Sequence, residues 1–213
     1  MQYGVDVAST RLDDLDKKIL AQVHAYIAGG ITPHVLDVGC GGGGLTAALL
    51  AAGARVTAID LDDYSQVISG RVTTVRNPQG NYQFEQADIR TWVARTSTSY
   101  DMVVLQRMVH YLPYEDARSL LAALLPRATH LYCAITGLRT AIARHYDGAR
   151  LPLRERFTRL DNEGQQVFSI TAPVCLYSED EVRQLFIESG WQIEWLRVSD
   201  FGNTKVVAVP TKQ

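Results

Sequence analysis

The sequence predicts an α/β protein built around one doubly wound sheet of seven strands, mostly parallel. Two observations lead to this prediction. Short runs that are apolar throughout alternate with helical segments along most of the chain, which is the pattern of a parallel sheet covered by helices on both faces. The alternation stops near the end, where two strands follow each other with no helix between them. A connection that short forces an antiparallel pair.

The elements follow from local patterns of apolar residues and turn residues. Strands are expected at 34–38, 55–60, 82–85, 102–105, 130–135, 191–198 and 204–209. Helices are expected at 11–28, 45–52, 114–125 and 179–189, where the spacing or the alanine and leucine content is helical. Ser9 or Thr10 is the expected N-cap of the first helix, and Gly29 with Gly30 is its expected end.

The segment 137–178 interrupts this regular order. It carries six of the 17 arginines, and its pattern suggests a hairpin formed by 157–160 and 166–170 around a turn at Asp161–Gly164. A connection this long inside a compact domain is usually functional. We therefore expect residues 1–213 to form a single domain with a lid-like insertion at about 137–178.

Composition excludes several classes of protein. The 213 residues are 46% hydrophobic and 21% charged, with a formal net charge of −2, which is ordinary globular usage. A charge of that size creates no global field toward nucleic acid or an anionic membrane. The stretch 139–159 differs, because its six arginines and two acids give +4 and leave −6 for the rest of the chain.

The cysteines and the N-terminus indicate the compartment. The three cysteines, Cys40, Cys133 and Cys175, form no C-x-x-C pair, so neither a disulfide framework nor a zinc knuckle is expected. The chain opens without the basic and apolar regions of a signal peptide, and no apolar run is long enough to span a membrane. We expect a cytoplasmic protein without a membrane partner.

A glycine cluster directly after the strand at 34–38 is the main functional signal. Five of the six residues from Gly39 to Gly44 are glycine, so the backbone can approach a ligand at the N-terminus of the next helix. Asp60, at the end of the second strand, is placed to bind two ribose hydroxyls. These features fit a nicotinamide dinucleotide or S-adenosylmethionine. Asp37 favours the second, because a carboxylate repels a pyrophosphate and attracts a sulfonium or an ammonium group.

The stretch 35–43, VLDVGCGGG, closely resembles motif I of the class I S-adenosylmethionine-dependent methyltransferases, which have a Rossmann-like fold. The resemblance continues in order through Asp60-Leu61, through 86–89 (QADI) and through 100–113 (YDMVVLQRMVHYLP). It implies S-adenosylmethionine as cofactor and S-adenosylhomocysteine as product. It also implies the cofactor-binding residues Asp37, Gly39, Cys40, Gly41, Asp60, Leu61, Asp88, Ile89 and Gln106.

Methyl transfer to oxygen or nitrogen often needs a general base, and His110 is the candidate. The resemblance places it just after the fourth strand, and an unperturbed histidine pKa near 6.5 suits a base. A structural role as a cap or a wall residue is the alternative. No metal site is expected, since Leu105, Gln106 and Arg107 stand where metal-dependent relatives have acids. The expected substrate-binding residues are Arg107, Tyr111, Tyr114 and Arg150.

The arginines of 139–159 have two interpretations. They form either an electropositive lid over an anionic acceptor or a solvated face, and the second is favoured. The sequence thus predicts a methyltransferase that acts by direct displacement on oxygen or nitrogen of a small molecule. The alternatives are a protein or RNA acceptor, although nucleic acid is disfavoured, or a non-catalytic S-adenosylmethionine-binding partner subunit. The sequence does not determine the acceptor or the oligomeric state.

Overall fold

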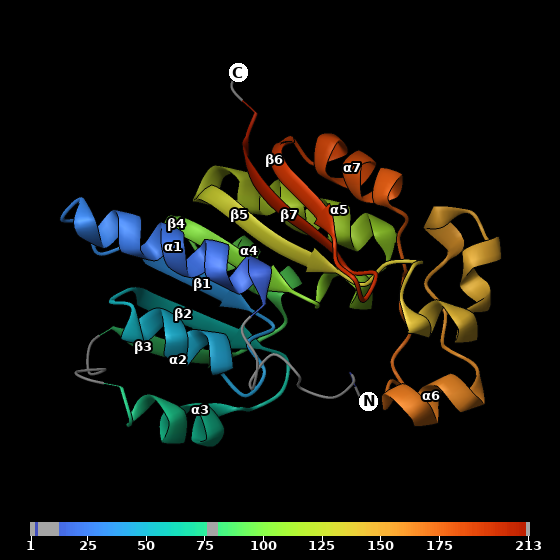
Figure 1. Ribbon diagram of the computed structural model, residues 1–213, viewed down its shortest axis with the longest axis horizontal. Coiled ribbons are helices and arrows are strands. Elements are labelled where there is room, and N and C mark those ends of the chain that lie inside the picture. Colours follow the sequence, from blue (N-terminus) through green and yellow to red (C-terminus); the bar gives the residue numbers. More distant parts are fainter. Residues whose placement is uncertain (1–2, 4–12, 76–80, 212–213) are drawn as a thin grey trace. The chain divides into compact units, whose positions relative to one another are not determined.

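The predicted sheet is present in the computed structural model, which describes residue 3 and residues 13–75 and 81–211 (Figure 1). Seven strands are arranged in the order β3-β2-β1-β4-β5-β7-β6. The pairs β1–β2, β1–β4 and β2–β3 are parallel, whereas β6–β7 is antiparallel. This arrangement confirms the predicted fold class.

The strands are β1 (His34–Val38), β2 (Arg55–Asp60), β3 (Tyr82–Gln86), β4 (Tyr100–Gln106), β5 (Ala128–Ile135), β6 (Trp191–Val198) and β7 (Thr204–Pro210). The helices are α1 (Asp14–Ala28), α2 (Gly44–Ala51), α3 (Ser65–Val72), α4 (Ile89–Arg95), α5 (Tyr114–Leu124), α6 (Asn162–Phe168) and α7 (Glu179–Glu188). Short 3₁₀ helices occupy Val109–Tyr111, Leu125–Arg127, Ala141–His145, Asp147–Arg150 and Leu153–Glu155.

The chain divides into two compact units. The N-terminal unit comprises Asp6–Leu105 and Pro126–Tyr132, and the C-terminal unit comprises Met1–Val5, Gln106–Leu125 and Cys133–Gln213. In the N-terminal unit every residue of β1 is buried. Such a strand is stable only when both of its faces are covered. Figure 1 shows helices on both sides of the strands of this unit.

Helix α1 begins later than the sequence suggested. Its N-cap is Asp13, whose side chain accepts from the backbone N–H groups of Leu15 and Asp16. In return, the Asp13 N–H donates to the Asp16 carboxylate. The expectation that Ser9 or Thr10 caps this helix is therefore wrong, and both lie outside the described residues. A cap adjacent to the first turn satisfies two otherwise free amides. The predicted end at Gly29 and Gly30 is confirmed, with Gly30 at φ +76°.

Helices α3 and α4 were not predicted. They have only eight and seven residues, and α3 buries just Ile68 and Val72. Two apolar residues are too few to produce a recognisable helical period. Tertiary packing against the sheet therefore decides that these segments are helical.

The C-terminal unit contains the predicted hairpin of β6 and β7. The Trp191 indole N–H, on β6, donates to the Leu121 carbonyl of α5 at 2.9 Å. At the tip of the hairpin Gly202 has φ +84°, and a Cβ there would lie 2.4 Å from the backbone of Arg139. Glycine is needed at this position, because both the backbone conformation and the close approach exclude a side chain.

The hairpin expected at 157–160 and 166–170 is absent, and that expectation is wrong. Residues Asn162–Phe168 form α6, and the Asp161 side chain accepts from the Gly164 N–H as its N-cap. The residue types at Asp161–Gly164 that favour a turn also favour the start of a helix. The segment has a small hydrophobic cluster of its own, made of Tyr146, Leu160, Ile170, Val174 and Leu176.

Arg156 is buried, unlike the other five arginines of 139–159, which are exposed. Its Nη1 donates to Glu181 Oε2 at 2.8 Å, and its other contacts are the carbonyls of Leu151 and Leu176. Glu181 Oε2 also accepts from the Ser178 N–H at 2.7 Å in the capping box of α7. The interpretation of the arginines as one lid or one solvated face is therefore wrong for Arg156, which fastens its segment to α7.

Replacing Arg156 should destabilise the protein. In Arg156→Ala, Glu181 loses its cation and two carbonyls lose a donor, so we expect the free energy of unfolding in urea to fall by about 3 kcal/mol. The matched control is Arg154→Ala, whose side chain is 70% exposed and pairs with Glu115; it should cost less than about 1 kcal/mol. Equal losses for the two variants would contradict the anchoring role of Arg156.

Candidate functional site

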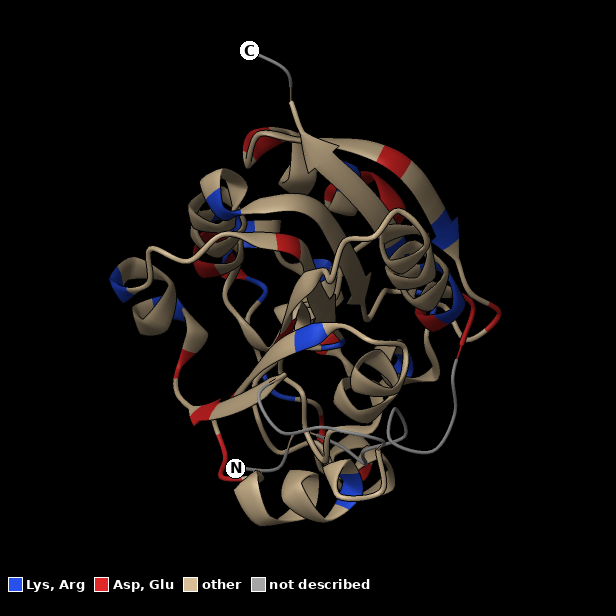
Figure 2. Cartoon of the chain, turned by 90° about the vertical axis from the view of Figure 1, so that its left-hand side faces the viewer, with Lys and Arg blue, Asp and Glu red and all other residues tan. Residues whose placement is uncertain are grey.

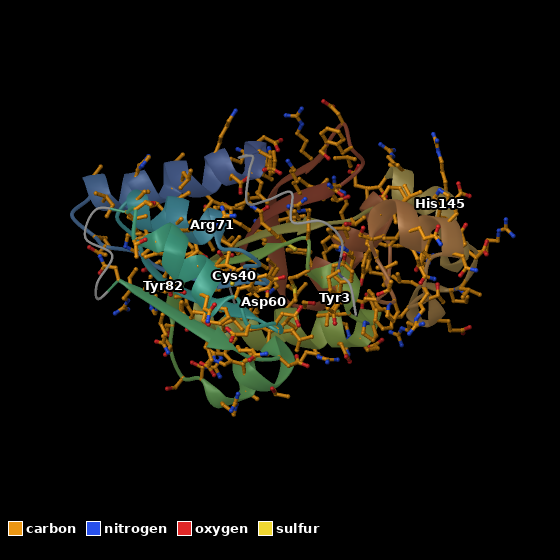
Figure 3. The ribbon with its side chains drawn as sticks, turned by 90° about the horizontal axis from the view of Figure 1, so that it is seen from below. Tyr3, Cys40, Asp60, Arg71, Tyr82 and His145 are labelled. Atoms are coloured by element: carbon orange, nitrogen blue, oxygen red, sulfur yellow. The ribbon has the colours of Figure 1, made fainter. Side chains whose placement is uncertain are left out.

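The glycine loop is held against the end of β2 by backbone hydrogen bonds. The amides of Gly39 and Cys40 donate to the Ile59 carbonyl at 2.8 and 3.2 Å. The Gly41 amide donates to Asp60 Oδ2 at 2.9 Å (Figure 3, where Cys40 and Asp60 are labelled). The carboxyl ends of β1 and β2 therefore meet at one point. Ligands of open parallel sheets bind at this edge.

The loop needs its glycines for backbone conformation. Gly39, Gly41 and Gly43 have φ values of +68°, +50° and +74°, which side chains other than hydrogen rarely allow. At Gly43, the N-cap of α2, a Cβ would also lie 2.7 Å from Ile68 of α3. The loop can thus curve tightly and present backbone N–H groups at the start of α2.

Asp37 is a buried carboxylate beside this loop. It is 2% exposed, and the Thr46 hydroxyl, from the first turn of α2, donates to its Oδ2 at 2.6 Å. Burial raises the pKa of Asp37 to about 6, although the Thr46 bond favours the ionised form. A cation bound next to Asp37 would lower this pKa again. The site is therefore suited to a positively charged group and unsuited to a pyrophosphate.

Asp60 and Leu61 end β2 as the sequence predicted. The two Asp60 oxygens accept from the amides of Gly41 and Asp62, and each oxygen keeps a lone pair for a further donor. Burial raises the pKa of Asp60, and these backbone hydrogen bonds oppose the shift. The Leu61 side chain is 50% exposed. An exposed leucine next to an acid with free lone pairs is suited to pack on a flat ring.

Asp88 and Ile89 lie at the start of α4. Asp88 is the N-cap and accepts from the Arg90 N–H, while the Arg90 guanidinium donates to both carboxylate oxygens. The hydrogen bonds from Arg90 hold the pKa of Asp88 below its usual value. Ile89 is 5% exposed. The Asp88 carboxylate is thus already paired, and any ligand contact that it makes competes with Arg90.

The other predicted site residues belong to the C-terminal unit. Gln106 ends β4, and Arg107 follows with a φ of +53°, a strained conformation for a non-glycine residue. The Arg107 amide donates to the Ala134 carbonyl at 2.7 Å, which holds this turn. His110 and Tyr111 follow in a 3₁₀ helix with ring centroids 4.2 Å apart.

His110 is more deeply buried than its predicted role suggested. It is 3% exposed, and its Nε2 lies 3.3 Å from the Thr136 hydroxyl. Its Nδ1 has no hydrogen-bond partner within the described part of the chain. Burial, with a smaller effect from Arg107, lowers the pKa of His110 to about 3. This pKa lies well below the unperturbed histidine value near 6.5, so burial holds the imidazole in its neutral form.

The predicted substrate-binding residues differ in what they contact. The Tyr111 hydroxyl donates to the Tyr3 carbonyl, and the two rings meet edge to face at 5.1 Å. The Tyr114 hydroxyl donates to Glu188 at 2.8 Å, and the residue is 2% exposed. Arg150 is exposed at the end of a 3₁₀ helix. Tyr114 is thus engaged with α7, whereas the Arg150 guanidinium is accessible.

Three residues that contact the predicted site residues were not predicted from the sequence: Thr46, Thr136 and Tyr3. Thr46 had a detectable signal, because a threonine in the first turn after the glycine loop faces back toward the strand that precedes it. Thr136 and Tyr3 had none, since their contacts with His110 and Tyr111 join positions 26 and 108 residues apart.

Among the described residues, no group of three or more His, Cys, Asp or Glu side chains is arranged to hold a metal ion. In the same residues, no helix combines the length and apolar character that crossing a bilayer requires. Basic and acidic residues are interspersed along the ribbon in the view of Figure 2.

The sequence is similar to known methyltransferases over part of its length. A methyltransferase-domain family model matches residues 35–127. A ubiquinone biosynthesis O-methyltransferase from Aromatoleum aromaticum is 31% identical over 118 residues, 55% of this chain and 45% of that protein. Its counterpart in Nitrosospira multiformis is 33% identical over 90 residues, 42% of this chain and 36% of that protein. The matched regions span less than half of these relatives.

Solved structures show the same fold over nearly the whole chain. Magnesium protoporphyrin IX methyltransferase from Synechocystis PCC 6803, with bound SAH (S-adenosylhomocysteine), has a TM-score of 0.62 at 18% identity, over 94% of this chain and 89% of that one. The 1,6-didemethyltoxoflavin-N1-methyltransferase of Burkholderia thailandensis, also with S-adenosylhomocysteine, has a TM-score of 0.63 at 16% identity, over 97% and 82%.

The buried carboxylate leads to a pH prediction for cofactor binding. Protonation of Asp37 below pH 6 removes the negative charge that attracts a cation, so wild-type affinity for S-adenosylmethionine should fall as the pH decreases, by about tenfold per pH unit. Asp37→Asn can still accept from Thr46 but has no charge. Its affinity should be at least about tenfold weaker at pH 8 and nearly independent of pH between 5 and 7.

Isothermal titration calorimetry measures both effects. The control is Glu194→Gln, which removes an exposed carboxylate from β6 and should follow the wild-type profile. A parallel pH profile in Asp37→Asn and in the wild type would contradict the role of Asp37.

Proposed function

Because the chain belongs to the class I S-adenosylmethionine-dependent methyltransferases, we propose that it transfers a methyl group to an oxygen or nitrogen atom of a small-molecule acceptor by direct displacement. The observation that carries this proposal is the buried Asp37 carboxylate beside a glycine loop fixed by Asp60. The name of one relative, a ubiquinone biosynthesis O-methyltransferase, and that of one structure with the same fold, a 1,6-didemethyltoxoflavin-N1-methyltransferase, support a small acceptor.

The residues of the N-terminal unit fit the charges of the cofactor. We assign the cofactor to Asp37, Gly39, Cys40, Gly41, Asp60, Leu61, Asp88 and Ile89, together with Gln106 at the end of β4. When bound, S-adenosylmethionine supplies an electrophilic methyl group on a sulfonium. The contribution of the protein is to hold the reacting groups in line and to exclude water. Asp37 provides the negative charge, and the loop amides provide the donors.

Arg107, Tyr111, Tyr114 and Arg150 are assigned to the acceptor. Arg150 is accessible for an anionic group, since a guanidinium binds carboxylate or phosphate through two hydrogen bonds. His110 acts through a neutral imidazole. The imidazole accepts a hydrogen bond from the methyl acceptor and thereby orients the lone pair of the atom that is methylated. With a pKa of about 3, it is a weak proton acceptor, so we expect it to position the acceptor. The carbon–sulfur bond of the sulfonium breaks as the new methyl bond forms, the thioether S-adenosylhomocysteine leaves, and the O–H or N–H proton of the acceptor passes to water.

Methyl transfer by the isolated chain is the direct test. Labelled S-adenosylmethionine and a protein-free metabolite extract should give a labelled small molecule, and S-adenosylhomocysteine should stabilise the protein by about 2.7 kcal/mol at 100 times its Kd. Asp60→Ala, which removes the acceptor of the Gly41 amide, should lose most of both effects while keeping its circular dichroism spectrum.

Three other outcomes would contradict parts of this proposal. Label found only in added protein or RNA would replace the small-molecule acceptor with a macromolecule. Label found only after a second protein is added would assign this chain to a non-catalytic subunit. Stabilisation by NAD instead of S-adenosylhomocysteine would overturn the cofactor assignment.

The role of His110 is tested by the pH dependence of turnover. His110→Ala should lower kcat by about tenfold or more while the Kd for S-adenosylhomocysteine changes less than twofold. His110→Gln, which keeps a hydrogen-bonding side chain, should recover part of the loss. The wild-type profile of kcat against pH should show no inflection near 6.5. An inflection there that disappears in His110→Gln would instead identify His110 as a general base with an ordinary pKa.

A further inference from the structure

A pocket of about 570 Å³ opens at the amino edge of the strands in the N-terminal unit. The first residues of four strands line it, namely His34 of β1, Arg55 of β2, Tyr82 of β3 and Tyr100 of β4. Trp92 and Arg95 of α4 and the connection to β4 complete the wall. This size is within the range of small-molecule sites, roughly 300–1,000 Å³.

The pocket is separate from the cofactor site. The glycine loop and Asp60 follow the carboxyl ends of β1 and β2, whereas the pocket lies at their amino ends. The strand from His34 to Gly39 rises about 3.3 Å per residue, so roughly 16 Å of sheet separates the two places. None of the residues assigned to the cofactor lines the pocket.

Arg55 is fixed at the pocket by a chain of hydrogen bonds. Its Nη2 lies 2.9 Å from His34 Nδ1, and His34 Nε2 lies 3.0 Å from the Thr57 hydroxyl. A guanidinium can only donate, so Nδ1 is the acceptor and the imidazole is neutral. Burial and the charge of Arg55 lower the pKa of His34 to about 4, in agreement. Among the described residues, His34 is the hydrogen-bond partner of the Arg55 side chain, so the arginine is held in position and its other N–H groups are available to a ligand.

Arg95 and a group of hydroxyls supply further donors. The Arg95 side chain is exposed, with no ion pair among the residues that the structure describes. Burial raises the pKa of Tyr100, while hydrogen bonds with the hydroxyls of Thr57, Thr96 and Thr98 oppose the shift. These hydroxyls line the same pocket. Guanidinium and hydroxyl donors in one concave site are typical of anion binding.

The pocket also has aromatic residues in its wall and an excess of positive charge. Glu85 is the one carboxylate among its lining residues against the two arginines, and its Oε2 accepts from the Trp92 indole N–H at 2.8 Å. The indole is thereby fixed, and its ring lies 6.5 Å from that of Tyr100. An anion with a flat or apolar body fits this combination.

We propose that this pocket is a second ligand site for an organic phosphate, with the phosphate bound by Arg55, Arg95 and the threonine hydroxyls, and the organic part against Trp92. A phosphate offers three terminal oxygens for two guanidinium groups and a hydroxyl, whereas a carboxylate offers two. This second site does not depend on the proposed function, because it shares no residue with the methyl-transfer machinery.

Calorimetric titration of phenyl phosphate into the chain saturated with S-adenosylhomocysteine tests the proposal. We expect saturable binding that Arg95→Ala weakens at least tenfold. The control Lys17→Ala removes one exposed positive charge from α1 in the same unit and should change the Kd less than twofold. Equal weakening in both variants, or no saturable binding at millimolar concentration, would overturn the site.

Nuclear magnetic resonance locates the ligand independently. Phenyl phosphate should shift the indole N–H signal of Trp92, identified with Trp92→Phe, and leave the amide signals of Gly39 and Gly41 unchanged. Benzoate, which carries a carboxylate on the same ring, should bind at least fivefold more weakly. Shifts confined to the glycine loop would place the ligand in the cofactor site, and equal binding of benzoate would exclude a phosphate-specific pocket.

Discussion

The hydrogen bond from the Gly41 amide to the Asp60 carboxylate is the contact on which the N-terminal unit depends for its binding edge. It joins the loop after β1 to the end of β2, and the amides of Gly39 and Cys40 extend this junction to the Ile59 carbonyl. Because the loop is fixed there, α2 begins at Gly44 and its first turn directs Thr46 back to Asp37. The hydrogen bonds between the loop and the end of β2 thus position both the loop and the surroundings of the buried acid.

Desolvation acts in opposite directions on two buried ionisable groups among the predicted site residues, Asp37 and His110. Burial raises the pKa of Asp37 to about 6 and lowers that of His110 to about 3, because in each case it disfavours the charged form. The consequences differ. A cation placed beside Asp37 would restore its charge, whereas burial holds the His110 imidazole neutral. The surroundings of Asp37 therefore favour a positively charged ligand, and those of His110 favour a neutral imidazole.

The arginines of 139–159 differ in burial and in their partners. Arg156 is enclosed by two carbonyls and Glu181, and it joins its segment to the capping box of α7. Arg150 is exposed and accessible to a ligand, while Arg154 makes a surface pair with Glu115. The segment therefore has a structural anchor of its own and a small hydrophobic cluster around Tyr146. Its order comes from these contacts, so its exposed arginines project from a folded segment.

The sequence alone determined the seven strands, the glycine loop and the acids at the ends of β1 and β2, because apolar runs, glycine positions and acidic residues next to them are local patterns. It did not determine α3 and α4, whose few apolar residues show no period, or the start of α1, where Asp13 caps in place of Ser9 or Thr10. Tertiary structure decided that 162–168 is a helix, that Arg156 is buried and that His110 is neutral. These properties depend on burial and on partners distant in sequence, such as Glu181 for Arg156 and Thr136 for His110, and neither is encoded in the neighbouring residues.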